Sequence, residues 1–273
     1  MAIVITGILA GIVAVFITRP VQGYVDSVRR AELTDAADVA LRRITRDVRL
    51  ALPNSLRVSG GCIEFIATST GGRYRDPGDG STNGDFLSFT DTTDKTFDVL
   101  GPPPSVAAAD YVVIYNLGPG YKPADAYCSM DPAHCPGGAP TGGNVATVSA
   151  VGGNTVTLAS NPFALQGPPL PSPNSRFQVV PSTEQAVSYV CAGGELRRYS
   201  GYGFNASQIC PPGGAGALLA GSAAAQPKAT CVLDYASAVT GRNGLLYVQL
   251  TLTDVPSTEA VTLVQQIHVD NSP

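Results

Sequence analysis

Side chains suited to acid–base or metal chemistry are scarce in this chain of 273 residues. It has two histidines, His134 and His268, and contains no P-loop, dinucleotide-binding, HExxH or GxSxG motif. A Ser–His–Asp site would have to use one of these histidines, and an ordinary surface or edge histidine is the simpler interpretation. The sequence therefore predicts no catalytic residue, no enzyme, no cofactor and no small-molecule substrate.

One loop resembles the first half of a calcium-binding loop. Side-chain oxygens recur at alternate positions, on Asp79, Ser81, Asn83 and Asp85. Gly84 stands at the sixth position, but the twelfth is Thr90, where a bidentate Glu is expected. Gly, Asn and Asp are also ordinary turn residues. A weak calcium site and a plain turn are therefore the two interpretations of this loop.

Six cysteines, an even number without a CxxC pair, predict disulfides in an oxidising compartment: Cys62, Cys128, Cys135, Cys191, Cys210 and Cys231. We expect Cys128 to pair with Cys135 in one short loop, and the other four leave three pairings open. The alternative is a zinc site that adds Asp131 and His134 to this loop, although six residues between two cysteines is not a usual zinc spacing.

The composition limits the class of protein. Gly and Pro are abundant, at 30 and 22 residues, without a Gly-X-Y period, and the 44% apolar content is too high for a disordered chain. The net charge of −4 gives no general attraction to nucleic acid. Two basic–aromatic clusters, 73–75 and 197–199, therefore favour ordinary sheet-face residues over a nucleic-acid interface.

Residues 1–18 carry no charge and would rise about 27 Å as a helix. This length predicts a half-helix that spans a membrane or lies in a filament core, with a signal peptide and a buried core helix as alternatives. By the positive-inside rule, Arg19, Arg29 and Arg30 would place the C-terminal end of this segment in the cytoplasm. The cysteines instead indicate that this end lies in an oxidising compartment. Together, the apolar segment and the cysteines predict a single-pass inner-membrane protein with its body in the periplasm.

Residues 19–52 form a second, amphipathic half-helix. Apolar residues recur near helical spacing: Val21, Val25, Val28, Ala36, Ala40, Ile44, Val48 and Leu52. Charged residues occupy the other positions and predict a solvated face, with Asp38 and Arg42 as a favourable pair. Contacts to neighbouring subunits or to anionic lipid are the alternative for the arginines. Residues 2–52 thus predict one helix of about 75 Å, kinked at Pro20 and stopped by Pro53.

Residues 53–273 predict a β-rich globular domain. Period-two segments predict strands over 62–68, 85–90, 111–116, 145–151, 154–159, 186–191, 195–199, 230–236, 245–253 and 260–269. Gly152-Gly153, Gly193-Gly194 and Asn243-Gly244 predict hairpins between strand pairs. Three segments rich in Gly, Pro, Ser and Ala predict surface loops: 69–84, 117–143 and 201–228.

An apolar helix that runs into an amphipathic helix and a β-rich body resembles type IV pilins and pseudopilins. The segment from Ile3 to Ala10 resembles the start of the mature family helix. Four stretches are most similar to the minor pilins of MSHA-type pili, in the J-type pseudopilin group: RPVQGYVD (19–26), LRRITRDVRLALPN (41–54), LRRYSGY (196–202) and QIHVD (266–270). The family's basic leader and its Gly-Phe-Thr-Leu-x-Glu motif are not seen here, and a chain without them would lack the carboxylate used in assembly.

The resemblance implies an α+β, pilin-like fold, with the long helix packed on an antiparallel sheet. It implies a structural minor subunit at the tip or in the initiating complex of a pilus, whose partners are other minor pilins and the assembly platform. Gly7 and Gly11 have the small-xxx-small spacing that permits close helix packing. The alternative function is a membrane-anchored periplasmic binding module, which a calcium ion could support.

Overall fold

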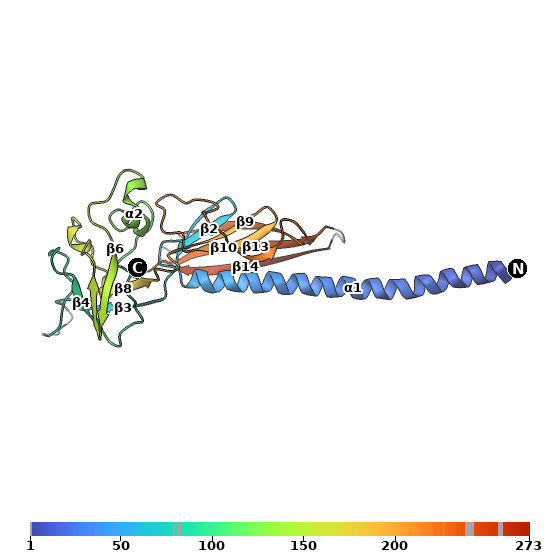
Figure 1. Cartoon of the computed structure of the whole chain (residues 1–273), viewed down its shortest axis with the longest axis horizontal. Helices are drawn as coiled ribbons and strands as arrows, with labels where there is room; N and C mark the ends of the chain where they lie inside the picture. Colours follow the sequence, from blue (N-terminus) through green and yellow to red (C-terminus); the bar gives the residue numbers. More distant parts are fainter. Residues whose placement is uncertain (1, 79, 81–82, 226, 238–242, 256–258) are drawn as a thin grey trace.

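The computed structural model places one long helix along a β-rich body (Figure 1). It describes all residues except 1, 79, 81–82, 226, 238–242 and 256–258. Along the helix, the side chains of residues 2, 8–10, 12–15 and 17–20 are also not described. The helices are α1 (Ala2–Arg49) and α2 (Ala126–Met130), with short 3-10 turns η1 (Pro132–His134), η2 (Phe163–Leu165) and η3 (Pro173–Ser175).

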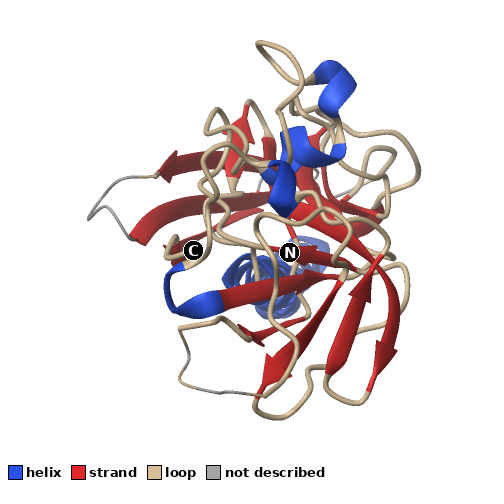
Figure 2. Cartoon of the chain, turned by 90° about the vertical axis from the view of Figure 1, so that its left-hand side faces the viewer, coloured by secondary structure: helices blue, strands red, loops and turns tan. Residues whose placement is uncertain are grey.

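The strands form two open sheets and one closed barrel, all with antiparallel pairing (Figure 2). The five-stranded sheet has the order β1 (Arg57–Ser59), β2 (Cys62–Ile66), β9 (Ala186–Ala192), β10 (Glu195–Ser200), β11 (Ala217–Gly221). The three-stranded sheet is β12 (Lys228–Ala236), β13 (Asn243–Asp254), β14 (Glu259–Asp270). The barrel has the order β3 (Thr70–Tyr74), β4 (Thr96–Leu100), β7 (Thr155–Leu158), β6 (Val145–Gly152), β5 (Tyr111–Val113), β8 (Arg176–Val180).

The predicted α+β, pilin-like fold with one antiparallel sheet is wrong. The described residues are mainly β, with fourteen strands in two sheets and a closed barrel. Much of the difference lies in the segments predicted as loops, because β3 lies within 69–84 and β11 within 201–228. Strands β1, β4 and β8 were also not predicted. Residues 85–90, predicted as a strand, are irregular.

All three strand pairs predicted as hairpins are paired, but the turn predicted at Asn243-Gly244 is wrong. β6 pairs with β7 around Gly152-Gly153, and β9 pairs with β10 around Gly193-Gly194. Asn243 and Gly244 instead begin β13. A Cβ on Gly244 would lie 2.5 Å from the hydroxyl oxygen of Tyr235, so this glycine permits a close approach within the sheet rather than a turn.

Helix α1 is docked only by its C-terminal part. Its buried residues begin at Leu33 and continue through Ile44 to Val48 in one core with both open sheets. Val21, Val25 and Val28, predicted on the same packing face, are exposed. The sheet does not extend along this part of α1, as Figure 1 shows. α1 ends at Arg49, and it continues through position 20 as one gently curved helix, where Pro20 predicted a kink.

The predicted transmembrane segment and single-pass inner-membrane localisation are corrected by the structure. Among the residues that it describes, no helix combines the length and the apolar character needed to cross a membrane.

The barrel is inserted in the sequence between two strands that pair in the five-stranded sheet. β2 pairs with β9, and Ile66 lies opposite Ala186, although the barrel strands lie between them in sequence. The barrel has its own core, which includes Phe97, Phe163 and Phe177. A separate cluster of buried residues joins the barrel to the end of α1: Leu52, Ile66, Val113, Ala126, Tyr127, Val145, Val180 and Ala186. Continuous packing therefore connects the barrel to the body.

Two glycines allow the barrel to close where the sequence predicts a loop. In β3, a Cβ on Gly71 would lie 2.8 Å from the carbonyl oxygen of Phe177, and one on Gly72 would lie 2.8 Å from the Phe177 ring. Both contacts are shorter than packed carbon atoms tolerate. The glycines that favoured a loop are therefore required by the pairing of β3 with β8.

We expect Gly72→Val to destabilise the protein by about 1–3 kcal/mol, because the added methyl groups overpack the barrel against Phe177. Gly152→Val is the matched control, since a Cβ there meets no atom within 4 Å. Urea unfolding of both variants measures the difference. Equal stability of the two variants would show that the barrel yields at Gly72 without cost.

Candidate assembly surface

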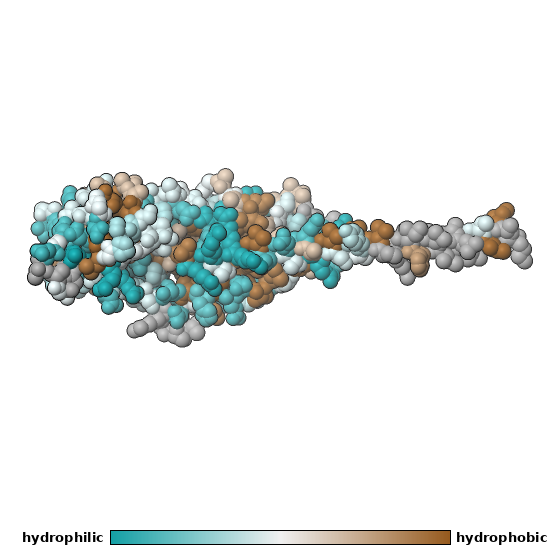
Figure 3. All heavy atoms as spheres, turned by 90° about the horizontal axis from the view of Figure 1, so that it is seen from below, coloured by the Kyte–Doolittle hydropathy of each residue, from teal (hydrophilic) through white to brown (hydrophobic). Residues whose placement is uncertain are grey.

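The N-terminal part of α1 projects beyond the body as an exposed helix (Figure 1). Its described apolar side chains are largely solvated: Ile3 is 87% exposed, Phe16 79% and Tyr24 72%. Figure 3 shows hydrophobic residues among the described residues of this projection, and both hydrophilic and hydrophobic residues over the body. A row of exposed large apolar side chains is unusual for a monomer and marks a surface that another chain can cover.

The two glycines predicted to pack helices lie on this projection. Gly7 and Gly11 are one helical turn apart, and a Cβ on either meets no atom within 4 Å. No contact within the described chain therefore explains their small size. The spacing gives another helix room to approach the backbone of α1 closely.

Some charged side chains of α1 form solvated ion pairs, and others contact the body. Arg42 pairs with Asp38 at 2.8 Å, as the i,i+4 spacing predicts, and both are well exposed. Arg30 bonds Glu259 at the near end of β14 at 2.9 Å. The prediction of a purely solvated charged face is wrong at Asp47, whose Oδ2 accepts a 2.7 Å bond from the Tyr189 hydroxyl and a 2.8 Å bond from Arg198 Nε.

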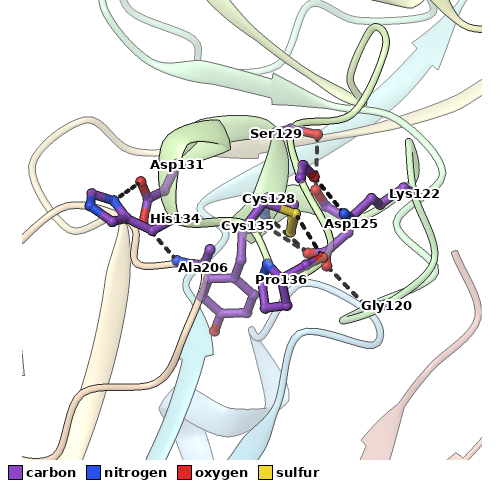
Figure 4. Close-up of a disulfide and its surroundings, with 12 residues drawn as sticks. Gly120, Lys122, Asp125, Cys128, Ser129, Asp131, His134, Cys135, Pro136 and Ala206 are labelled. Carbon is purple, nitrogen blue, oxygen red and sulfur yellow. Dashed lines mark hydrogen bonds and ion pairs between the residues drawn. A yellow bond between two sulfur atoms is a disulfide. The ribbon is translucent and has the colours of Figure 1, made fainter.

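The disulfide that clips the 128–135 loop joins Cys128 to Cys135, the pairing expected from the sequence (Figure 4). The loop is positioned by Asp125, whose carboxylate accepts the backbone N–H groups of Tyr127 and Cys128 at the start of α2. His134 bonds Asp131 at 2.7 Å and is 79% exposed. The zinc interpretation is wrong, because both sulfurs are bonded to each other and neither is a thiolate.

The other two disulfides resolve the pairings that the sequence left open. Cys62 of β2 is joined to Cys210 in the loop between β10 and β11. Cys191 of β9 is joined to Cys231 of β12, and this bond links the five-stranded sheet to the three-stranded sheet. No cysteine of the chain is unpaired.

The calcium candidates are only partly described. Asp79 and Ser81 lie outside the described residues. Asn83 is exposed, and the backbone N–H of Asp85 donates to Asp98 Oδ2 at 3.0 Å. Hydrogen bonds from Thr155 and from the Asp85 backbone lower the pKa of Asp98. Within the described residues, no group of three or more His, Cys, Asp or Glu is placed to hold a metal ion.

The remaining sequence candidates take part in sheets and internal pairs. His268 is an exposed residue of β14 opposite Leu245. Arg197 bonds Glu195 at 2.6 Å, and Arg198 bonds Asp47 and Glu184. Such internal neutralisation favours the sheet-face interpretation of the 197–199 cluster over a nucleic-acid interface.

A buried ion pair was missed by the sequence reasoning. Glu64 of β2 is fully buried and bonds Arg57 of the neighbouring strand β1. The guanidinium also donates to the backbone oxygens of Asn205 and Ala206, and it lies 3.7 Å from the centre of the Tyr127 ring. Burial raises the pKa of Glu64 while Arg57 opposes the rise. The only signal for this ion pair in the sequence was that Arg57 and Glu64 carry opposite charges and lie opposite each other when their segments pair as adjacent strands.

No protein-family model, curated protein or solved structure matches this chain.

Proposed function

We propose that this protein is a structural subunit that joins like subunits through the projecting part of α1. The observation that carries the proposal is the solvation of the described apolar side chains on that helix, such as Ile3, Phe16 and Tyr24, before Leu33 enters the core. A helix of this kind loses unfavourable apolar exposure when a second helix covers it. The resemblance of the protein's sequence to minor pilins, which assemble by helix packing, supports the same role.

The architecture suits such a subunit. The barrel lies at the end of the molecule opposite the projecting helix (Figure 1). Helices could therefore pack side by side while each barrel stays at the surface of the assembly. The shared core connects the body to the docked part of α1, and the Cys191–Cys231 disulfide links the two sheets that form this core, so the projecting part is held at one fixed place on the body.

We expect Gly11→Leu to weaken self-association by about tenfold or more, because the larger side chain holds a neighbouring helix away. The variant has open space within its own chain, so the body should keep its native unfolding midpoint. Sedimentation of the full chain in mild detergent, over a range of concentrations, measures the association.

Gly213→Leu is the control for the added side chain, since position 213 also has open space but lies in the loop before β11. It should associate like the original protein. A chain that stays monomeric at high concentration, or one that associates equally well with Leu at position 11, would contradict the proposal.

A further inference from the structure

A cleft of about 890 Å³ lies where the barrel meets the body. Its body side is formed by residues near the end of α1, in β12 and at the C-terminus, which Figure 1 places at this junction. Its barrel side is formed by the loop after β5 and by η3. Clefts of this size at the boundary of two structural units are the usual place for a ligand.

The floor of the cleft is held by hydrogen bonds of two asparagine side chains, Asn54 and Asn116. Asn54 Nδ2 donates to the backbone oxygens of Asn116 and Asn271, at 2.9 and 3.1 Å. Asn116 returns a 2.7 Å bond to the backbone oxygen of Pro53. Gly118 permits this close approach of the two backbones, because a Cβ there would lie 2.5 Å from the backbone carbonyl oxygen of Asn54. These bonds cross between barrel and body, so the cleft is formed before any ligand binds.

Residues in left-handed backbone conformations gather around the same cleft. Asn54, Tyr115 and Asn174 line it, with φ angles of 59°, 49° and 61°. Such angles are uncommon for residues other than glycine; asparagine tolerates them best, whereas they are costly for a bulky residue such as tyrosine. Residues held in these conformations cluster at binding sites, where the surrounding structure stabilises them. Arg73 of β3 stabilises one of them here, because its Nε donates to the Asn174 carbonyl at 2.9 Å.

The lining offers aromatic rings and unused polar groups. Tyr115, Tyr121 and Tyr235 line the cleft, and Tyr121 is 64% exposed although its backbone is fixed in a turn with Gly118. Within the described residues, the hydroxyls of Tyr115 and Tyr121 and the guanidinium of Arg176 have no hydrogen-bond or ion-pair partner. These groups are therefore available to a ligand.

Among the described side chains that line the cleft, Arg176 is also the only charged one. A guanidinium binds a carboxylate through two parallel N–H donors. Tyrosine rings present a flat apolar face and a polar tip, which suit a ring with C–H groups on its face and hydroxyls on its rim. A sugar ring that carries a carboxylate has both properties.

We propose that this cleft binds an acidic saccharide, with its carboxylate on Arg176 and a sugar ring against Tyr121. The site is independent of helix-mediated assembly, since it lies at the far end of the body from the projecting helix (Figure 1). A subunit assembled through α1 would keep this cleft accessible to a surface polysaccharide.

Calorimetric titration of the full chain with trigalacturonate tests the proposal, and neutral maltotriose is the matched probe. We expect trigalacturonate to bind at least tenfold more tightly than maltotriose. Tyr121→Ala and Arg176→Gln should each weaken trigalacturonate binding about tenfold or more. Tyr24→Ala and Arg42→Gln are the controls, because both residues are exposed on α1 and should leave binding unchanged.

A second measurement separates charge recognition from a general loss of structure. Trigalacturonate binding should weaken as salt rises, and Arg176→Gln should remove most of that dependence. No trigalacturonate binding, equal binding of maltotriose, or binding that survives both cleft variants would overturn the proposal. The result is also separate from Gly11→Leu, which should leave trigalacturonate binding intact.

Discussion

Replacing Arg57 with Ala should destabilise the protein by about 3–5 kcal/mol at pH 7. The reason is the fully buried Glu64, which would lose the charged partner that Arg57 provides. The same change removes the bonds to the backbone of Asn205 and Ala206 and the contact with the Tyr127 ring. One side chain therefore connects β1, β2, α2 and the loop that follows β10.

The loss should depend on pH in a defined direction. Burial already raises the pKa of Glu64, and removal of Arg57 raises it further because the guanidinium favours the charged form. A carboxyl group whose pKa is higher in the folded than in the unfolded state binds protons on folding, so stability falls as pH rises through the folded pKa. The variant should therefore recover part of its lost stability as pH falls toward 4.5, the ordinary value for Glu.

Urea unfolding of Arg57→Ala at pH 7 and pH 5 measures both effects. Arg42→Ala is the matched control, because its pair with Asp38 is exposed and should contribute less than about 1 kcal/mol. A loss at Arg57 no larger than that of the control would show that Glu64 finds another partner or water. A loss that is the same at both pH values would contradict the role of the Glu64 charge.

Replacing Asp47 with Ala should cost about 2–4 kcal/mol and loosen the docked half of α1. Its carboxylate is the acceptor for the hydroxyl of Tyr189 and for Arg198, and both of these side chains are buried or nearly so. Burial and the Asp47 charge raise the pKa of Tyr189, so its hydroxyl stays protonated and remains a donor. The variant would leave both donors without this acceptor, and Arg198 would keep only its bonds to the more exposed Glu184 and to the Ser200 hydroxyl.

Urea unfolding gives the change in stability, and amide hydrogen exchange over residues 33–49 reports the loosening of the helix. Asp38→Ala is the control on the same helix, since Asp38 belongs to a solvated pair. Asp47→Asn should fall between the two, because its amide oxygen can still accept from Tyr189. Unchanged exchange in Asp47→Ala would mean that apolar packing alone holds α1.

Local patterns predicted the elements that depend on near neighbours in the chain. The helical period and Pro53 predicted α1 to within a few residues of its end at Arg49. Alternating apolar residues predicted β2, β9 and β14, and paired glycines predicted the turns that follow β6 and β9. The short spacing of Cys128 and Cys135 indicated their disulfide. Each of these predictions rests on a pattern within a few neighbouring residues, which the order of amino acids expresses directly.

The sequence reasoning failed where distant segments meet. Glycines in β3 indicated a loop, but they are required because Phe177 lies against them from a strand about a hundred residues away. The apolar face of α1 gave no sign that burial begins only at Leu33, because that limit depends on where the sheet ends. The cleft was equally hidden, since its two sides come from segments widely separated in the chain.

Patterns among neighbouring residues were thus enough to predict a long helix, a β-rich body and one local disulfide. The closure of the barrel, the Cys62–Cys210 and Cys191–Cys231 pairings, the buried Arg57–Glu64 pair and the cleft at Arg176 depend on contacts between segments that are distant in the chain. The physical reason is the range of the interactions. Hydrogen-bond periodicity and turn chemistry act between neighbours, whereas packing, disulfide geometry and burial of charge depend on which distant residues the fold brings together.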